Sequence, residues 1–301
     1  MRPTEDFLAT PADVEVHPRR SVLYAPGSNE RALQKAATLP VDGVILDLED
    51  AVAPDRKATA RELVCAATAS DTYGMREVAI RVNAAGTPWY EEDLRAACAV
   101  APNGLVLPKV TSPDDVHAAE AAVDAAGGSD RTRLWVMIET PRAVLECAKI
   151  AAASERVAVL VLGTNDLIKE LGVVPVADRT PLLMALSTCV LGARAAGVAV
   201  LDGVYNDVRD VPGFEAECVQ GRQLGFDGKT LIHPGQVEVA NRVFAPTESE
   251  LETARRTIDA YEGARAEGRG VATLDGRLIE SLHVETARRS LALHEAVARR
   301  G

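Results

Sequence analysis

The apolar residues of this 301-residue chain fall into short runs, and longer Ala-rich amphipathic stretches separate them. The runs are nearly continuous in Val, Ile and Leu, as in parallel strands covered on both faces. This alternation predicts repeated strand–helix units around a parallel sheet. Eight runs end in loop-like residues: SVLYAPG from Ser21, GVILDLED from Gly43, VAIRVN from Val78, GLVLPKV from Gly104, LWVMIET from Leu134, VAVLVLGTND from Val157, VAVLDGVY from Val198 and GFDGKTLIHP from Gly225.

The eight units predict an α/β fold, a (β/α)8 TIM barrel over residues 19–245. A doubly wound open sheet is the alternative, which the absence of a G-x-G-x-x-G turn after any run disfavours. Residues 246–301 lie outside the units and predict a C-terminal helical lid or oligomerisation segment. We expect a helix over 245–262, a flexible glycine-punctuated joint over 263–276 and a last helix over 278–300. Residues 1–18 predict a flexible N-terminal arm.

Composition limits the classes of partner and the cellular location that the chain can have. The net charge of −11 argues against a nucleic-acid partner. No apolar run approaches the roughly 20 residues that span a membrane, and the N-terminus lacks the apolar core of a signal peptide. The five cysteines form no C-x-x-C pair, which argues against a zinc site or a disulfide framework. These features predict a cytoplasmic protein.

Polar residues follow strand after strand at the ends of the runs. In a TIM barrel, functional residues gather at the carboxyl ends of the strands. We therefore expect the active site there. The residues at seven run ends are Tyr24; Asp47, Glu49 and Asp50; Arg81 and Asn83; Lys109; Glu139; Asn165 and Asp166; and His233.

Glu139 and Asp166 end consecutive runs. Because neighbouring strands lie about 4.8 Å apart, two such carboxylates repel each other unless a cation lies between them. Mg²⁺ typically takes one or two carboxylates together with waters and substrate oxygens. The alternative is that each acid caps the helix that follows, since Pro141 suits the first position of a helix. Spacing alone leaves both interpretations open.

Two further features suggest anion binding. Arg81 ends a buried strand and requires an anionic partner, which is either a substrate or a structural acid such as Asp47 or Glu49. Basic residues gather around the first strand and the helix after it, which indicates either a phosphate site or a solvated helix face. His233 is either a base or a buried structural histidine, and His283 and His294 look structural. The basic residues are Arg19, Arg20, Arg31 and Lys35.

From about Arg20 to the C-terminus the chain resembles the HpcH/HpaI aldolase and citrate lyase β-subunit family. Within it, the CoA-dependent malyl-CoA and citramalyl-CoA lyases are the most similar. The matching segments occur in order and with the expected spacing. They are RSVLYAPGSNERALQKA, GVILDLEDAVAPDRKATAR, IRVN, LPKV, MIETPRAV, LGTNDLIKELG and FDGKTLIHPGQVEVAN.

This resemblance implies a TIM barrel that binds Mg²⁺ and a CoA thioester. It implies that Glu139 and Asp166 are metal ligands and that Arg81 contacts the acyl group. Non-CoA aldolases of the wider family carry a histidine just after the second strand, where this chain has Asp50. The residues that match CoA- or substrate-contacting positions are Tyr24, Arg31 and Lys35, together with Ile232 and His233, which contact substrate through the backbone.

The tail departs from the family pattern. In lyases with a C-terminal lid, an aspartate in a motif like G-x-M-I-D enters the neighbouring subunit's site and acts as the acid/base. This chain has Gly276-Arg277-Leu278-Ile279-Glu280, so the matching residue is Glu280, and Asp275 just upstream is a second candidate. The shared site implies a homo-oligomer, a trimer or a hexamer.

The predicted function is that of an Mg²⁺-dependent acyl-CoA lyase. It would make or break a carbon–carbon bond between a 2-oxo acid, glyoxylate or pyruvate, and acetyl-CoA. Arg81 would stabilise the enolate or the thioester oxygen, and Glu280 or Asp275 would exchange the proton. The alternatives are a malyl-CoA-type thioesterase, the β subunit of a citrate lyase, a non-CoA aldolase and a non-catalytic CoA-binding protein.

Overall fold

The structure is a computed structural model that describes residues 16–300. Residues 1–15 of the expected N-terminal arm, and Gly301, lie outside the described residues. The chain divides into two compact units. One is Arg19–Phe244, and the other is Ala245–Gly301 together with the N-terminal segment that ends at Pro18.

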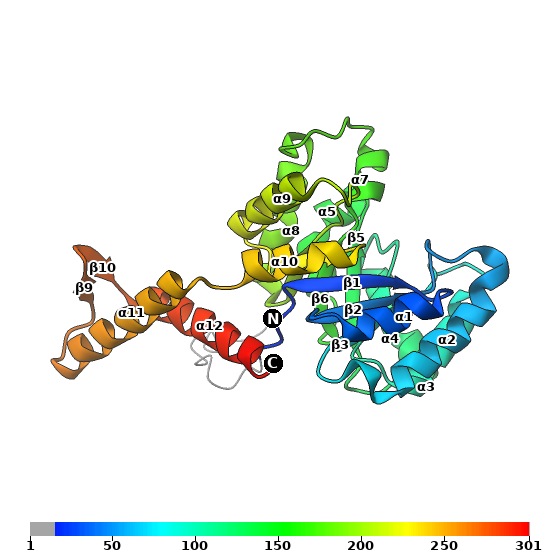
Figure 1. The fold of residues 1–301 in the computed structure, drawn as a ribbon, viewed down its shortest axis with the longest axis horizontal. Coiled ribbons are helices and arrows are strands. Elements are labelled where there is room, and N and C mark those ends of the chain that lie inside the picture. The colour runs from blue at the N-terminus through cyan, green and yellow to red at the C-terminus, as the bar shows by residue number, and fades with distance from the viewer. Residues whose placement is uncertain (1–15, 301) are drawn as a thin grey trace. The chain divides into compact units, whose positions relative to one another are not determined.

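Residues 19–244 form a closed barrel of eight parallel strands surrounded by helices (Figure 1). Each strand pairs with the next, and β8 pairs with β1. The predicted TIM barrel is therefore confirmed. Its strands are β1 (Ser21–Pro26), β2 (Gly43–Asp47), β3 (Glu77–Arg81), β4 (Gly104–Leu107), β5 (Arg133–Ile138), β6 (Val157–Leu162), β7 (Ala199–Asp202) and β8 (Gly228–Leu231).

Ten α-helices of the described chain cover the barrel, and short 3₁₀ turns such as η5 (Thr180–Leu182) and η6 (Pro234–Gln236) join some of them. The helices are α1 (Glu30–Thr38), α2 (Lys57–Ala69), α3 (Tyr90–Val100), α4 (Pro113–Ala125), α5 (Pro141–Leu145), α6 (Cys147–Ala151), α7 (Thr164–Leu171), α8 (Leu183–Ala196), α9 (Val211–Leu224) and α10 (Val237–Phe244).

Two of the predicted run boundaries are wrong. The sixth run stops at Leu162, and Asp166 lies in the first turn of α7. The eighth strand begins at Gly228, because Gly225 ends α9 with a left-handed φ of 103°. Glycine has no Cβ and adopts this conformation without steric cost.

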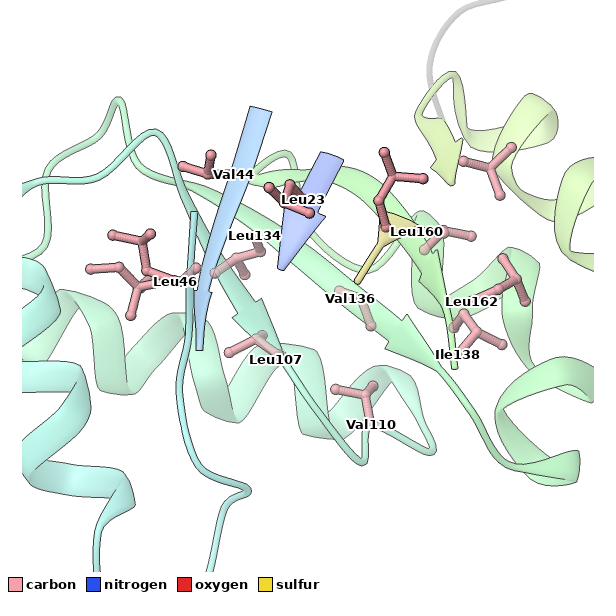
Figure 2. Packing of buried hydrophobic residues seen from close by; sticks show 14 of the residues in the cluster. Leu23, Val44, Leu46, Leu107, Val110, Leu134, Val136, Ile138, Leu160 and Leu162 are labelled. Atoms are coloured by element: carbon pink, nitrogen blue, oxygen red, sulfur yellow. The ribbon is translucent and has the colours of Figure 1, made fainter. Parts of the chain in front are cut away.

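The pleat of the strands sorts their side chains into two layers, since successive residues of a strand point to opposite faces. Leu23, Val44 and Leu46 pack with helix residues in the outer core, part of which Figure 2 shows. Their neighbours Val22 and Ile45 belong to a separate cluster that contains the fully buried Trp135. The sheet is closed, so this second cluster fills the barrel.

The inward-facing positions continue toward the carboxyl ends of the strands, two residues at a time. Val22 is followed by Tyr24, Ile45 by Asp47, Ala79 by Arg81, and Met137 by Glu139. The same alternation that builds the apolar interior therefore directs these four polar side chains into the mouth of the barrel.

The C-terminal unit contains α11 (Glu248–Ala266), a two-stranded hairpin of β9 (Ala272–Leu274) and β10 (Arg277–Ile279), and α12 (Ser281–Ala298). The joint expected over 263–276 is shorter in the structure, because 263–266 complete α11 and 272–276 form the first strand and the turn of the hairpin, which leaves 267–271 between them. Asp275 and Gly276 make its turn with φ of 50° and 76°. Two positive φ values mark a type I′ turn, for which Asp-Gly is a preferred sequence. The last helix begins at Ser281 rather than Leu278.

The five cysteines are free thiols, and four of them are buried. Within residues 16–300 no helix combines the length and the apolar character needed to cross a membrane.

Candidate active site

Arg81 lies at the centre of the polar side chains in the barrel mouth. It pairs with Asp47 across β2 and β3, and its Nε and Nη2 donate to the two carboxylate oxygens of Asp47 at 2.7 Å each. Its Nη1 lies 3.0 Å from Glu49 Oε2 and 3.8 Å from Asp50 Oδ2. The ring of half-buried Tyr24 packs 5.0 Å from the guanidinium. The structural partners considered for Arg81 are thus present, while its contact with an acyl group stays a prediction.

Glu49 is buried just beyond β2 and remains incompletely bonded. Its Oε2 contacts the Arg81 guanidinium but accepts no hydrogen bond. Burial raises the pKa of Glu49 to about 8, against the opposing charge of Arg81. Burial likewise raises the pKa of Tyr24. Glu49 is therefore a carboxyl group of the mouth that retains its proton near neutral pH.

Glu139 and Asp166 are brought together by Lys109. The Lys109 backbone N–H donates to Glu139 Oε1 at 2.6 Å, and its ammonium donates to Asp166 Oδ2 at 2.7 Å. The same Nζ lies 3.5 Å from Glu139 Oε1. The expectation that the two acids lie close together is met, and a cation does lie between them.

The two acids experience different environments. Burial raises the pKa of Glu139, which is 1% exposed. Burial also acts to raise the pKa of Asp166, but the hydrogen bond and charge of Lys109 outweigh it, so the net shift is downward. The same two carboxylates raise the pKa of the Lys109 ammonium despite its partial burial. The pair therefore favours a bound cation.

The local structure leaves Glu139 available as a ligand. Thr140, not Glu139, is the N-cap of α5, and its hydroxyl accepts from Ala143 N. Glu139 Oε2 is buried without a hydrogen-bond partner. Gly163 makes room for that oxygen, since a Cβ there would lie 2.7 Å from it. Asp166 is acidic in the first turn of α7, where the helix dipole favours it.

This donor set fits Mg²⁺. Mg²⁺ typically takes one or two carboxylates and keeps waters or substrate oxygens in its other positions. Glu139 and Asp166 lie on adjacent elements, and one oxygen of Glu139 is buried without a hydrogen-bond partner. A cage made by the protein alone is not present in the described chain, which has no group of three or more His, Cys, Asp or Glu arranged to hold a metal.

Lys57 is a site residue that the sequence analysis missed. It is 6% exposed, and its ammonium donates to Leu48 O at 2.7 Å, Glu49 O at 2.8 Å and Asn83 Oδ1 at 2.6 Å. Two of these bonds fix the backbone that carries Glu49, and the third ties it to the segment after β3. A lysine is almost never buried without such partners. Nothing in the one-dimensional pattern distinguishes Lys57 from an exposed residue such as Lys35.

The basic group around β1 is smaller than expected. Arg19 and Arg20 form ion pairs of 2.6 and 2.8 Å with acids at the amino ends of β3 and β2, so their inclusion in a phosphate site is wrong. Arg31 and Lys35 are exposed and lie one helical turn apart on α1. These two residues remain as the candidate anion site.

The segment after β8 is held by Gln236. Gln236 Oε1 accepts from the backbone N–H groups of Ile232 at 3.0 Å and His233 at 3.2 Å. His233 is exposed rather than buried, and its Nδ1 accepts from Gly235 N at 3.0 Å. His233 thus shapes the turn into η6. Substrate contact through this backbone stays a prediction and would fall to the carbonyl oxygens.

In the C-terminal unit both candidate lid acids have local partners. Asp275 lies at the hairpin turn and accepts from Arg256 Nη2 at 2.7 Å. Glu280 is the N-cap of α12, and its backbone N–H donates to His283 Nδ1 at 3.0 Å. The structural role expected for His283 is therefore observed.

A cavity of about 320 Å³ lies between the segments that follow β6 and β7. Thr164 and Asn165, the two residues before Asp166, line it together with Tyr205 and Arg179. Neither Glu139, Asp166 nor Arg81 lines it. The cavity therefore lies beside the group formed by these three residues, next to the start of α7.

Known proteins resemble this chain over most of its length. The family model of the HpcH/HpaI aldolase/citrate lyase family matches residues 20–234. The chain belongs to this family. A (3S)-malyl-CoA thioesterase of Cereibacter sphaeroides is 48% identical over 284 residues, which cover 94% of this chain and 97% of the relative. The citrate lyase subunit beta of Escherichia coli is 36% identical over 92% of this chain and 93% of its own length.

A solved structure extends the comparison to ligands. CitE from Mycobacterium tuberculosis, in complex with magnesium, acetoacetate and coenzyme A, is 30% identical and superposes with a TM-score of 0.73 over 92% of this chain and 97% of its own. A citrate lyase from Burkholderia xenovorans, 24% identical with a TM-score of 0.81, covers 96% of this chain and 95% of its own and supports the fold. The family of this chain is thus one that processes CoA thioesters.

Proposed function

We propose that this chain is an Mg²⁺-dependent enzyme that acts on a malyl-CoA-type thioester and hydrolyses its thioester bond. The observation that carries the proposal is the Glu139–Asp166 pair in the barrel mouth, which is held around the ammonium of Lys109. Similarity to the malyl-CoA thioesterase over nearly the whole chain supports hydrolysis. The magnesium and coenzyme A of the CitE complex support the cofactor and the substrate class.

Glu139 and Asp166 would hold the metal, with Glu139 contributing the oxygen that accepts no hydrogen bond. Bound Mg²⁺ supplies Lewis acidity toward substrate oxygens. Arg81, fixed by its two bonds to Asp47, offers positive charge beside the acyl group. Arg31 and Lys35 on α1 would bind the phosphates of CoA.

Glu49 is the best placed acid of the barrel for proton transfer. Its Oε2 lies 3.0 Å from the Arg81 guanidinium and accepts no hydrogen bond, so the carboxyl has spare capacity. A general acid must hold its proton near the working pH, and the raised pKa of Glu49, about 8, meets that condition. The Lys57 ammonium positions it through the Glu49 carbonyl.

Carbon–carbon cleavage is the second candidate. The citrate lyase β subunits support it, since they match the chain over most of its length. The same mouth would serve, with Arg81 stabilising the enolate of acetyl-CoA in place of the oxyanion that forms when water adds to the thioester. The two reactions differ in which bond of one substrate breaks.

Product analysis separates the two reactions. The pure protein is incubated with malyl-CoA and Mg²⁺ in water enriched in ¹⁸O, and thioesters and acids are followed by mass spectrometry. Hydrolysis gives free CoA and malate that carries one ¹⁸O. Carbon–carbon cleavage gives acetyl-CoA and glyoxylate. Unchanged malyl-CoA would contradict both and leave a non-catalytic CoA-binding role.

The C-terminal unit is proposed to complete the site of a neighbouring subunit in a homotrimer or hexamer. A cavity of about 700 Å³ and the exposed side chains of Leu278 and Leu282, 56% and 55% exposed, give this unit a surface for contact. If Glu280 supplies the acid/base, Glu280→Gln lowers kcat strongly and leaves metal affinity unchanged, while Asp275→Asn is the matched control. A fully active monomer in sedimentation would remove the shared site.

A further inference from the structure

Lys109 is unusual in three ways. It is one of four described non-glycine residues with positive φ, at 57°. Its backbone N–H is bonded to one candidate metal ligand and its side chain to the other, at 2.6 and 2.7 Å. Its side chain is 38% exposed, whereas Glu139 beneath it is 1% exposed. The residue is thus anchored at its backbone and open to solvent at its charged end.

The Lys109 ammonium and a divalent cation compete for the same pair of carboxylates, Glu139 and Asp166. An ion that bridges Glu139 and Asp166 takes an oxygen from each at about 2.1 Å. The ammonium already bonds Asp166 Oδ2 and lies 3.5 Å from Glu139 Oε1. Two cations cannot both lie within contact distance of these oxygens without strong mutual repulsion.

We propose that Lys109 is the internal counter-cation of the Glu139–Asp166 pair, and that a divalent metal binds by displacing its ammonium from Asp166. This inference rests on the metal site of the proposed function. Because the backbone bond to Glu139 remains, only the exposed side chain has to move. Lys109 therefore keeps the two carboxylates paired before the metal arrives, and it lowers metal affinity by the strength of its own contacts.

Calorimetric titration with MgCl₂ tests the exchange in the wild type and in Lys109→Met. Removing a charge-assisted contact of this kind should make Mg²⁺ bind roughly tenfold more tightly. Lys109→Arg keeps the charge and should stay near the wild-type affinity. Lys169→Met is the matched control, because Lys169 lies on α7 near Asp166 and acts on it only through its charge. It should change affinity about twofold or less.

A second measurement uses the wild type alone and does not depend on the variant folding. Sparse acetylation with acetic anhydride, read by mass spectrometry, should label Lys109 several-fold faster once Mg²⁺ is added, whereas Lys169 should be unaffected. Unchanged or weaker Mg²⁺ binding in Lys109→Met, or slower labelling of Lys109 with Mg²⁺, would show that Lys109 supports the site instead of competing for it. Absence of Mg²⁺ binding to the wild type would instead contradict the metal site of the proposed function.

Discussion

Two clusters of buried charges lie in this barrel, and they are built in opposite ways. One lies on the outer face of the barrel sheet, where Arg179 and Lys229 contact Asp202 of β7 and Glu217 of α9. Lys229 and Asp202 are fully buried. Both oxygens of Asp202 accept hydrogen bonds, from Arg179 at 2.8 Å each and from Lys229 at 3.0 Å. Burial acts to raise the pKa of Asp202, but these two cations outweigh it and the net shift is downward.

The cluster in the barrel mouth is unbalanced. Arg81 contacts three carboxylates and Lys109 contacts two. In the described chain, the buried carboxylate oxygens without a hydrogen-bond partner are those of Glu49 and Glu139, and both lie in this mouth. A partly satisfied cluster costs stability, and perturbed groups of this kind gather at functional sites. We infer that the balanced cluster stabilises the fold, and we propose that the unbalanced one binds a cation and a substrate.

The largest expected effect is on catalysis. Asp166→Ala should lower kcat/KM for the thioester by about 10⁴-fold, or about 5 kcal/mol of barrier, because it removes half of the metal site. Urea unfolding should change little, since the Asp166 side chain is 32% exposed. Glu170→Ala, an exposed neighbour on α7, is the control. Full activity in EDTA would break the assignment of the mouth as a metal site.

Breaking the balanced cluster should act on stability instead. Asp202→Asn leaves Lys229 and Arg179 without their shared counter-charge, so we expect a loss of about 3–5 kcal/mol in the free energy of unfolding. Urea denaturation followed by circular dichroism measures it. Glu139→Gln in the mouth, measured without metal, should lower the free energy of unfolding far less. It removes a buried charge, one oxygen of which accepts no hydrogen bond. Equal losses in the two variants would erase the distinction between the clusters.

The mouth cluster should also make the stability of the protein depend on pH, through Glu49. The pKa of Glu49 is about 8 in the folded protein, against an ordinary value of 4.5 for a solvated glutamate. Between these values the folded state binds the extra proton, so the free energy of unfolding falls as pH rises, by up to about 1.4 kcal/mol per pH unit. Glu49→Gln, compared with the wild type in EDTA, should gain relative stability as the pH rises through this range. Parallel pH profiles would show that Glu49 is already ionised.

The smallest effect is expected at the surface of α1. Lys35→Ala should raise KM for the thioester by about tenfold or less and leave kcat nearly unchanged, because an exposed contact to phosphate contributes roughly 1 kcal/mol. Lys149→Ala on α6, also exposed, is the control. The increase in KM should shrink at high salt. Equal use of a free acid without CoA would contradict the CoA role of α1.

The barrel and the polar side chains in its mouth could be predicted from the sequence because both follow from local rules. Strand period and run length place Tyr24, Asp47, Arg81 and Glu139 on one inward-facing series. The partners of those residues do not follow from period, since Lys57 and Lys109 reach their acceptors only through loop geometry.

Two other differences between the predictions and the structure also have local causes. Glycines over 263–276 indicated a flexible joint, yet Asp275-Gly276 serves a tight hairpin turn whose strands are only three residues long. Such strands are too short for a period to be recognised. Arg19 and Arg20 are adjacent to the basic residues of α1 in sequence, but they lie at the opposite end of the first strand–helix unit, where acids bind them.

The most direct test of the central claim is anomalous diffraction from crystals grown with Mn²⁺, a substitute for Mg²⁺ that prefers the same oxygen ligands. We expect one strong peak in the barrel mouth, about 2.2 Å from a carboxylate oxygen of Glu139 and one of Asp166, with the Lys109 ammonium moved away from Asp166. A peak elsewhere, or no peak with Lys109 still bonded to Asp166, would contradict it.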